Sequence, residues 1–257
     1  MPLELVTIPC LEDNYAFLLH NADSGETLLV DVPEAEPIHA TLQAQGWTLT
    51  DILLTHHHWD HVDGLAPLLK MLPDRPRVIG AALDAHRLPD LDLAVHPGDE
   101  VTICGETAVV FDVSGHTIHH IAVHFPKSGV LFTADSLMAL GCGRVFEGTP
   151  AQMWDSLLQL RDLPDDTRVC SGHEYTETNA RFAQTIEPDN PDLILRVKEI
   201  TKTRAAGQPT VPSTLGLEKR TNPFLRADVD ALKTSIDMAD ADPVDVFAHV
   251  RKKRDDF

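Results

Sequence analysis

The chain has few of the features that mark secreted or membrane proteins. It has only four cysteines in 257 residues, Cys10, Cys104, Cys142 and Cys170, far apart and without a C-x-x-C pair. Free thiols in a reducing compartment are therefore expected rather than disulfides. No apolar run reaches the length of a membrane span. The N-terminus has no basic segment before an apolar one, so we expect no secretory signal and a cytoplasmic protein.

Basic residues are also scarce. The chain has 21 Lys and Arg against 40 Asp and Glu, a net charge of -19. Residues 1–174 hold 8 of the basic and 26 of the acidic residues, whereas the end of the chain is locally basic at Arg251-Lys252-Lys253-Arg254. A nucleic-acid surface needs a broad basic footprint, so we expect no nucleic-acid partner. We also expect no membrane association and a monomer.

Short apolar segments rich in Val, Ile and Leu predict a sheet-based α/β core in the first part of the chain. Helices are expected at 36–45 and 64–71, and from the Thr149 cap, where Thr149, Pro150 and Gln152 form a capping-box pattern, to about residue 160. The strands are predicted at 3–9, 17–20, 27–31, 51–54, 77–80, 101–103, 107–113, 119–124, 130–134 and 167–171.

After Gly172 the pattern becomes helical. Helices are predicted at 176–186, at 191–206 with Asn190 as the cap, and from Asp242-Pro243 to about residue 255. Residues 207–227 contain three prolines and Gly216 and are expected to be irregular. We place a domain boundary near 174/175, with domains 1–174 and 175–257.

What is abundant is histidine, and four of the 14 histidines lie in the heptapeptide Thr55–His61. His56, His58, Asp60 and His61 follow the spacing H-x-H-x-D-H. Imidazole and carboxylate ligands suit zinc, iron or manganese. His56 and His58 are two residues apart at a strand end and point the same way, whereas Asp60 and His61 lie at a turn. One short loop is therefore predicted to serve two metal ions.

Three later residues match this loop in kind. His116 follows Gly115, Asp135 ends an apolar strand, and His173 follows Gly172. Each lies just after a predicted strand, where the loops of a sheet converge. Taken singly, a histidine after glycine reads as a turn residue and an aspartate at a strand end as a helix cap. Together with the heptapeptide, they complete a first coordination shell.

This order of motifs, T-H-x-H-x-D-H, G-H-T, a strand-end Asp and G-H, resembles the metallo-β-lactamase superfamily. Longer matches narrow the resemblance to the glyoxalase II family, the hydroxyacylglutathione hydrolases, over essentially the whole chain. They are Leu11–Tyr15, Gly141–Thr149, Gly172–Thr176, Asn222–Arg226 and Arg251–Phe257.

The resemblance implies an α/β fold of four layers, an αββα sandwich, followed by a helical C-terminal domain. It also implies two divalent metal ions, zinc first, with iron or manganese as alternatives. His56, His58 and His116 would hold one ion; Asp60, His61 and His173 would hold the other. Asp135 would bridge the two, and Asp60 and Asp135 would be the catalytic carboxylates.

The chain departs from the family pattern in two places. The family usually has G-H-T-x-G-H, and here His119 replaces the second glycine. The backbone at His119 must therefore be one that a residue with a Cβ can adopt, and we favour a structural role over one beside the metal. The usual V-D-P-G reads Val30-Asp31-Val32-Pro33. Asp31, His57, Trp59 and Asp63 are interpreted as structural or supporting residues rather than ligands.

The implied reaction is hydrolysis of S-D-lactoylglutathione to D-lactate and glutathione, the second step of the glyoxalase pathway. Two metal ions lower the pKa of a shared water toward about 7, which supplies a hydroxide nucleophile at neutral pH. A thiolate leaves readily, so no strong general acid and no covalent acyl-enzyme are expected.

Glutathione carries two carboxylates, so an acidic enzyme needs local positive charge to hold it. Val244, Phe247, Arg251 and Arg254 follow the spacing of one helix face, which predicts that the two arginines face the protein. The resemblance implies that Arg251 and Arg254 bind the glycine carboxylate and that Arg144 and Tyr175 contact the tripeptide backbone. Lys252 and Lys253 fall on the other side and are expected to be solvated. The alternative is a basic tail without a ligand.

Rival functions share the first motif. They are a glutathione persulfide dioxygenase with one iron, another hydrolase of the superfamily that acts on a β-lactam, RNA or a different thioester, and an inactive metal-binding module. The dioxygenases resemble the chain less beyond residue 175, a nuclease needs more basic surface, and the complete ligand set argues against an inactive module.

Overall fold

A computed structural model describes residues 3–257. By the contacts between its residues, the chain divides into two compact units. Unit 1 comprises Met1–Asp112 and His119–Ala134, and unit 2 comprises Val113–Ile118 and Asp135–Phe257. This division differs from the boundary expected near 174/175, which rests on the change of sequence pattern and stays a prediction.

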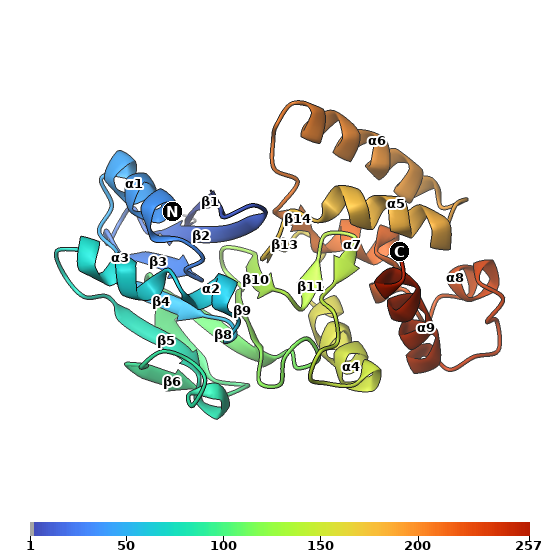
Figure 1. The fold of residues 1–257 in the computed structure, drawn as a ribbon, viewed down its shortest axis with the longest axis horizontal. Helices are drawn as coiled ribbons and strands as arrows, with labels where there is room; N and C mark the ends of the chain where they lie inside the picture. The colour runs from blue at the N-terminus through green and yellow to red at the C-terminus, as the bar shows by residue number, and fades with distance from the viewer. Residues whose placement is uncertain (1–2) are drawn as a thin grey trace. The chain divides into compact units, whose positions relative to one another are not determined.

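The first sheet of unit 1 has six strands in sequence order (Figure 1). They are β1 (Glu4–Cys10), β2 (Asn14–His20), β3 (Thr27–Val30), β4 (Asp51–Leu54), β5 (Arg77–Ala81) and β6 (Leu93–Val95). Strands β1 to β3 pair antiparallel, and β3 to β6 pair parallel. Every residue of β2, β3 and β4 is buried, as expected of central strands that are covered on both faces.

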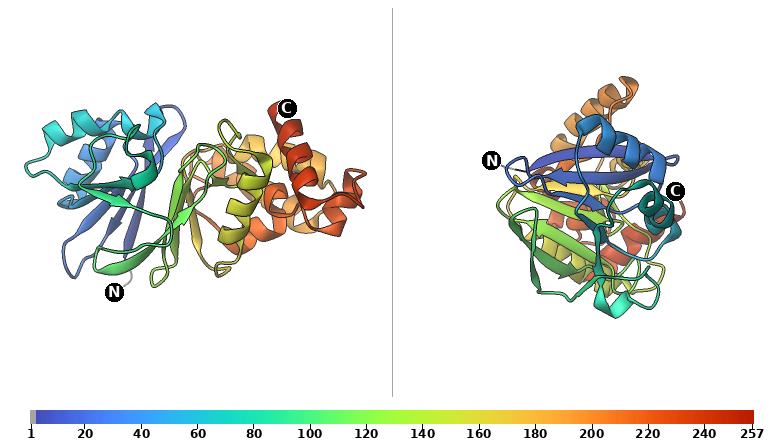
Figure 2. Two further views of the ribbon diagram at one scale, coloured as in Figure 1. Left: turned by 90° about the horizontal axis from the view of Figure 1, so that it is seen from below. Right: turned by 90° about the vertical axis from the view of Figure 1, so that its left-hand side faces the viewer.

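Four more strands of unit 1 form an antiparallel ladder. They are β7 (Glu100–Ile103), β8 (Glu106–Asp112), β9 (Ile121–Phe125) and β10 (Val130–Ala134). Phe132 of β10 contacts Phe17 of β2, with ring centroids 5.8 Å apart, and Phe125 of β9, with centroids 5.9 Å apart. The two sets of strands therefore face each other across an aromatic core (Figure 2).

The helices of unit 1 cover the first sheet on its other face (Figure 2). They are α1 (Ala35–Gln45), α2 (Trp59–Val62) and α3 (Leu65–Met71), with a 3₁₀ turn η1 (Ala82–Asp84). Helix α1 buries Ile38 and Leu42 and contacts β1 and α3. Helix, sheet and sheet give three layers of the expected sandwich within this unit. In residues 3–257, no helix has the length and apolarity needed to cross a membrane.

Unit 2 begins its regular structure with a hairpin of two short strands, β11 (Leu137–Met138) and β12 (Gly141–Cys142). Helix α4 (Pro150–Arg161) follows. The Thr149 hydroxyl accepts from the Gln152 backbone N–H, and the Gln152 side chain accepts from the Thr149 N–H, so the predicted capping box is confirmed. Strand β13 (Arg168–Ser171) pairs with β14 (Ser213–Thr214).

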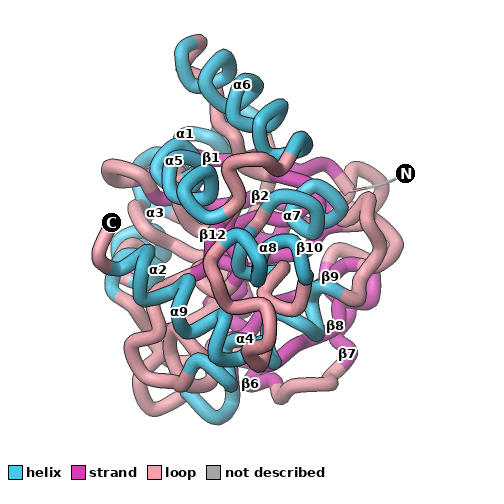
Figure 3. The backbone as a smooth tube through the Cα atoms, turned by 90° about the vertical axis from the view of Figure 1, so that its right-hand side faces the viewer, coloured by secondary structure: helices cyan, strands magenta, loops and turns pink. Residues whose placement is uncertain are grey.

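The rest of unit 2 is helical (Figure 3). The elements are α5 (Thr176–Ile186), α6 (Pro191–Ala205), α7 (Leu215–Thr221), the 3₁₀ turn η2 (Pro223–Leu225), α8 (Asp230–Ser235) and α9 (Pro243–Asp255). Helix α5 packs on α6, α6 on α7, and α4 on α9. Asn190 caps α6 by accepting from the backbone N–H groups of residues 192 and 193, and Asp242 caps α9, as predicted.

The expectation of irregular structure over 207–227 is wrong in part, because α7 and η2 lie there. Pro223 occupies the first turn of η2, where a missing N–H costs nothing, and the Asn222 side chain caps that turn. Leu215 and Phe224 are buried. Such short helices are stabilised by packing rather than by their own propensity. The prolines of 207–227 therefore did not prevent helix formation there.

His119 has a φ of 69°. This left-handed conformation is the one glycine adopts without steric cost, and a side chain makes it less favourable by roughly 1 kcal/mol or more. The backbone at residue 119 therefore has the turn conformation that favours glycine, although the residue is a histidine. The side chain lines a small hollow with Leu83, Val95 and Pro97, which agrees with a structural role.

Candidate metal centre

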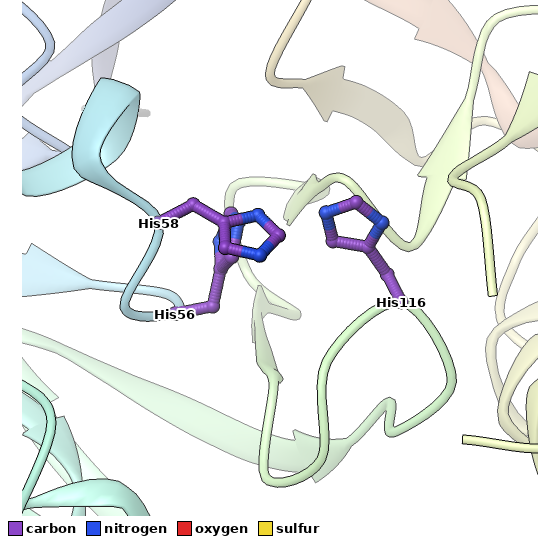
Figure 4. Close-up of side chains that lie close together, drawn as sticks. All are labelled: His56, His58 and His116. Atoms are coloured by element: carbon purple, nitrogen blue, oxygen red, sulfur yellow. The ribbon is translucent and has the colours of Figure 1, made fainter. Parts of the chain in front are cut away.

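In unit 1, the candidate ligands follow the buried strand β4. Figure 4 shows His56 and His58 on the loop after this strand. Their ring centroids are 4.7 Å apart, and the rings of His56 and His61 are 4.3 Å apart. His56 and His61 are fully buried. The loop therefore brings together three imidazoles that sequence spacing predicted as ligands.

Asp31 holds the His61 ring in place. Asp31 Oδ2 lies 2.8 Å from His61 Nδ1 and accepts from the Thr55 hydroxyl at 2.8 Å, while Oδ1 accepts from the Thr55 N–H at 2.9 Å. A carboxylate that accepts from Nδ1–H leaves Nε2 as the metal-binding nitrogen. Asp31, His56 and His61 offer ligand atoms within 4.8 Å of one another. Because both Asp31 oxygens already accept hydrogen bonds, we assign Asp31 to orientation.

We expect Asp31→Asn to weaken metal binding about 10-fold, the lower end of what loss of such a supporting group costs. An amide has one acceptor oxygen where the carboxylate serves three donors. Its NH₂ would face Thr55 or His61. Competition with a chelator measures the metal Kd; Asp63→Asn, an exposed aspartate on the same segment, is the control. An unchanged Kd in Asp31→Asn would remove this role.

Asp60, on α2, is oriented by Asn14. The Asn14 side-chain amide donates to the Asp60 backbone oxygen and to Asp60 Oδ2, each at 3.1 Å. Asp60 Oδ2 lies 3.8 Å from His61 Nε2. Sequence reasoning quoted Asn14 within a family motif but gave it no role. The available signal was its place in the family match Leu11–Tyr15, because the strand predicted at 17–20 did not reach Asn14.

His57 points to a different partner from its neighbours. His57 Nδ1 lies 3.1 Å from Asp84 Oδ2, and Asp84 is fully buried and also binds Arg87. Trp59, another residue of the heptapeptide that is not a predicted ligand, is 65% exposed. Both placements agree with the reading of these two residues as non-ligands.

In unit 2, three predicted ligands lie in contact. Asp135 Oδ2 is 3.4 Å from His116 Nε2 and 3.3 Å from His173 Nε2. All three side chains are buried. His116 lies on the loop that follows β8 (Figure 4), Asp135 comes directly after β10, and His173 follows β13. One carboxylate oxygen thus contacts both histidines.

The backbone next to Asp135 fixes these side chains. His116 Nδ1 lies 2.8 Å from the Arg144 carbonyl oxygen, which again leaves Nε2 for a metal. A Cβ at Gly143 would come within 2.0 Å of the Asp135 carbonyl oxygen and 2.8 Å of His116 Nδ1. Glycine is therefore required at 143 because the Asp135 carbonyl oxygen and the His116 ring lie close to its Cα, and not because of its φ. The His173 ring stacks on Tyr175 with centroids 4.7 Å apart.

The chain therefore carries His/Asp metal-binding clusters. Within unit 1 one of them is Asp31, His56 and His61, and within unit 2 Asp135 contacts His116 and His173. Buried imidazoles whose Nδ1 atoms face Asp31 and a carbonyl oxygen, together with nearby carboxylates, form the donor set that zinc and neighbouring transition metals bind. The chemistry of the donors fits the metal site that the sequence predicted.

Three guanidinium groups of unit 2 gather near Asp255. Arg251 Nη2 donates to Asp255 Oδ1 at 2.9 Å, and Arg144 Nε lies 3.6 Å from the same oxygen. Burial, and then the positive charges of Arg251 and Arg144, lower the pKa of the Arg254 guanidinium. Three cations share one nearby carboxylate, so this corner of an acidic protein is a place for an anion.

Helix α9 turns toward the protein the face that the sequence predicted. Phe247 and Arg251 are buried, Val244 and Arg254 are half-buried, and Lys252 and Lys253 are exposed. Arg251 is only 6% exposed. It donates to the Cys142 carbonyl oxygen at 2.8 Å and lies over the Phe224 ring. Arg254 donates to Asn179 Oδ1 from Nε and Nη2, both at 3.2 Å.

Comparison with known proteins decides the family. The profile of the metallo-beta-lactamase superfamily matches residues 13–173, and that of the hydroxyacylglutathione hydrolase C-terminus matches residues 174–257. The hydroxyacylglutathione hydrolase of Jannaschia sp. (strain CCS1) is 63% identical over 99% of this chain and 98% of its own. The chain belongs to the hydroxyacylglutathione hydrolases. The Ruegeria pomeroyi enzyme of the same name is 60% identical over the full length of both chains.

Solved structures confirm the fold of this hydroxyacylglutathione hydrolase. ETHE1 from Myxococcus xanthus has a TM-score of 0.68 at 24% identity, covering 98% of this chain and 90% of that one. The BLEG-1 B3 metallo-beta-lactamase has a TM-score of 0.66 at 22% identity, over 86% and 99%. TTHA1623, in a di-iron-bound form, has a TM-score of 0.61 at 26% identity, over 88% and 100%. The predicted metallo-β-lactamase fold with a helical C-terminal region is confirmed.

Proposed function

We propose that this hydroxyacylglutathione hydrolase cleaves S-D-lactoylglutathione to D-lactate and glutathione, the second step of the glyoxalase pathway. The observation that carries the proposal is the group of three arginines near Asp255 in a protein of net charge -19. A His/Asp metal centre alone serves lactamases, nucleases, dioxygenases and thioesterases alike. A cationic corner suited to a peptide carboxylate is what a glutathione ester needs.

The proposed metal ligands are the predicted ones. His56, His58 and His116 would hold one divalent ion, and Asp60, His61 and His173 would hold the other. Asp135 would be the ligand that the two ions share. The contacts of Asp135 with two histidines and the di-iron form of a protein of this fold support two ions per chain. We propose zinc as the first candidate, with iron or manganese as alternatives, because such donors accept all three.

Two divalent ions at such a site supply a water whose pKa is lowered toward about 7. The residues of the chain do the rest. Asp60 and Asp135 offset positive charge, Asn14 holds Asp60 in position, and Asp31 fixes the His61 tautomer. Burial raises the pKa of the Cys142 thiol to about 11, so this cysteine stays protonated at neutral pH and is not a nucleophile.

The proposed glutathione contacts lie in unit 2. The sequence assigned the glycine carboxylate to Arg251 and Arg254. Because Arg144 and Arg254 are more exposed than Arg251, we propose instead that Arg144 and Arg254 present the guanidinium groups that pair with the substrate carboxylate. Arg251 anchors α9 to β12 through the Cys142 carbonyl oxygen and orients the group. Tyr175, 37% exposed, offers a hydroxyl to the tripeptide. Residues 1–174 thus carry the metal chemistry and residues 175–257 supply binding groups, in a monomer.

Loss of the thioester absorbance of S-D-lactoylglutathione tests the proposal directly. We expect turnover that is lost on dialysis against a chelator and restored by Zn²⁺, Fe²⁺ or Mn²⁺, with two ions bound per chain. One iron per chain together with oxygen uptake on glutathione persulfide would instead establish the dioxygenase. Turnover of a β-lactam or RNA without turnover of the thioester would establish another hydrolase.

A further inference from the structure

A buried polar group of unit 2 lies outside the residues that the proposed reaction uses. Glu218 of α7 is fully buried, in the segment that the sequence pattern left irregular. Its carboxylate accepts from four donors. Oε2 accepts from the Leu140 N–H at 2.9 Å and the Asn222 amide at 3.2 Å, while Oε1 accepts from the Arg196 guanidinium and the Ser213 hydroxyl. An acceptor-only carboxylate matches this set of donors.

Asn222 continues the same network onto the β11–β12 hairpin. Its amide donates to the Met138 carbonyl oxygen at 3.0 Å and to the Gly141 carbonyl oxygen at 2.9 Å. Glu218 and Asn222 together therefore bind backbone groups of three of the four residues from 138 to 141. Leu140 in the turn has a φ of 56°, a conformation that a residue with a Cβ adopts only when its surroundings hold it.

The hairpin lies between two parts of the metal centre. It begins two residues after Asp135, and the Gly143 N–H that follows it donates to the Ser136 carbonyl oxygen at 3.2 Å. The next residue, Arg144, presents the carbonyl oxygen that faces His116 Nδ1 at 2.8 Å. A shift of the hairpin would thus move the Asp135 main chain and the group that orients His116.

We propose that Glu218 and Asn222 are positioning residues that set the geometry of Asp135 and His116 through the β11–β12 hairpin. In residues 3–257, their hydrogen bonds go to neither the predicted metal ligands nor the proposed substrate contacts. The inference rests on the proposed function only in assigning Asp135 and His116 to metal binding. Supporting residues of this kind are typically worth 10–100-fold in metal affinity or activity.

The test compares Glu218→Gln with a matched variant, Glu187→Gln. Glu187 is also buried and also pairs with an arginine of unit 2, accepting from Arg226 Nε at 2.8 Å and Nη2 at 2.9 Å. The structure gives Glu187 no hydrogen bond to the hairpin in the described residues. Both variants are expected to unfold at a lower temperature than the parent, because each leaves a guanidinium poorly paired, buried at Arg196 and partly buried at Arg226.

Only Glu218→Gln is expected to change the metal site. Chelator competition with Zn²⁺ alone should show a Kd raised about 10-fold, and kcat on S-D-lactoylglutathione should fall about 10-fold with KM within about two-fold. Glu187→Gln should keep the metal Kd and the kcat of the parent. If Glu218→Gln loses thermal stability to the same extent as Glu187→Gln and still keeps the metal Kd and the kcat of the parent, the proposal is overturned.

Asn222→Ser covers the case in which Glu218→Gln does not fold. Serine still caps η2 through its oxygen but removes the two amide donors to the hairpin. The same rise in Zn²⁺ Kd is expected, and an unchanged Kd overturns the proposal. The Zn²⁺ Kd is measured without substrate, so it tests the positioning role separately from the proposed thioester hydrolysis. A parent that binds Zn²⁺ but hydrolyses no thioester refutes the proposed function and leaves the positioning role to be decided by the Kd values.

Discussion

Asp135→Ala is expected to reduce kcat/KM at least about 10³-fold, the loss that follows removal of one strong transition-state stabiliser. Asp135 contacts His116 and His173 in the same unit, and its proposed place is between the two ions. Its loss removes the bridge and a negative charge that offsets theirs. Metal analysis after gel filtration should show fewer than two ions per chain. Asp155→Ala, at an exposed position of α4, is the control.

Thermal unfolding gives a second readout of the same change. A ligand that binds only the folded state raises its stability by RT ln(1 + [L]/Kd), about 2.7 kcal/mol at 100 times Kd. Chelation should therefore lower the Tm of the parent and of Asp155→Ala clearly, and that of Asp135→Ala much less. An Asp135→Ala enzyme with two ions and more than a tenth of the parent activity would show that Asp135 is not the bridge.

Arg254→Ala is expected to raise KM for S-D-lactoylglutathione roughly 30-fold and to leave kcat within about two-fold. A hydrogen bond to a charged group contributes about 2 kcal/mol, and binding that is equal in ground and transition states appears in KM. The half-buried guanidinium lies near two other arginines, and burial first and then their charges lower its pKa. Lys253→Ala, which removes an exposed positive charge from the residue before Arg254, should leave KM and kcat unchanged. A KM that does not move in Arg254→Ala refutes its role as a carboxylate ligand.

Arg251→Ala should behave differently from its neighbour on the same helix face. Arg251 is buried, donates to the Cys142 carbonyl oxygen and lies over Phe224. Truncation should cost about 2 kcal/mol of folding stability as well as substrate affinity, because it removes a charge-assisted hydrogen bond and packing. A fall in Tm for Arg251→Ala but not for Arg254→Ala separates anchoring from binding.

Local pattern was sufficient for most of the longer helices and strands. Strand β10 and helix α5 begin and end where the apolar spacing and flanking turn residues predicted. The caps at Thr149, Asn190 and Asp242 are also as predicted. Pattern failed over the short elements, which have at most three strand residues or fewer than two helical turns. They are β6, β11, β12, β14, α2, α7, α8, η1 and η2. Elements of this length are too short to show a period, and packing from distant segments decides them.

The sequence alone determined the chemistry of the ligands. The spacing from His56 to His61, and the strand-end positions of His116, Asp135 and His173, named the candidate ligand residues, because ligand type depends on residue identity and on which strand ends carry it. The family resemblance added the basic end of α9. None of these conclusions needed coordinates.

The tertiary structure decided which polar groups hold those donors in place. These hydrogen bonds join residues separated by 30 to 84 positions in the chain. They link Asn14 to Asp60, Asp31 to His61, and Glu218 and Asn222 to the β11–β12 hairpin. It also separated Arg251, which anchors, from Arg254, which is half-buried. A hydrogen bond depends on a few tenths of an ångström between such distant segments, and only the packed chain sets that distance.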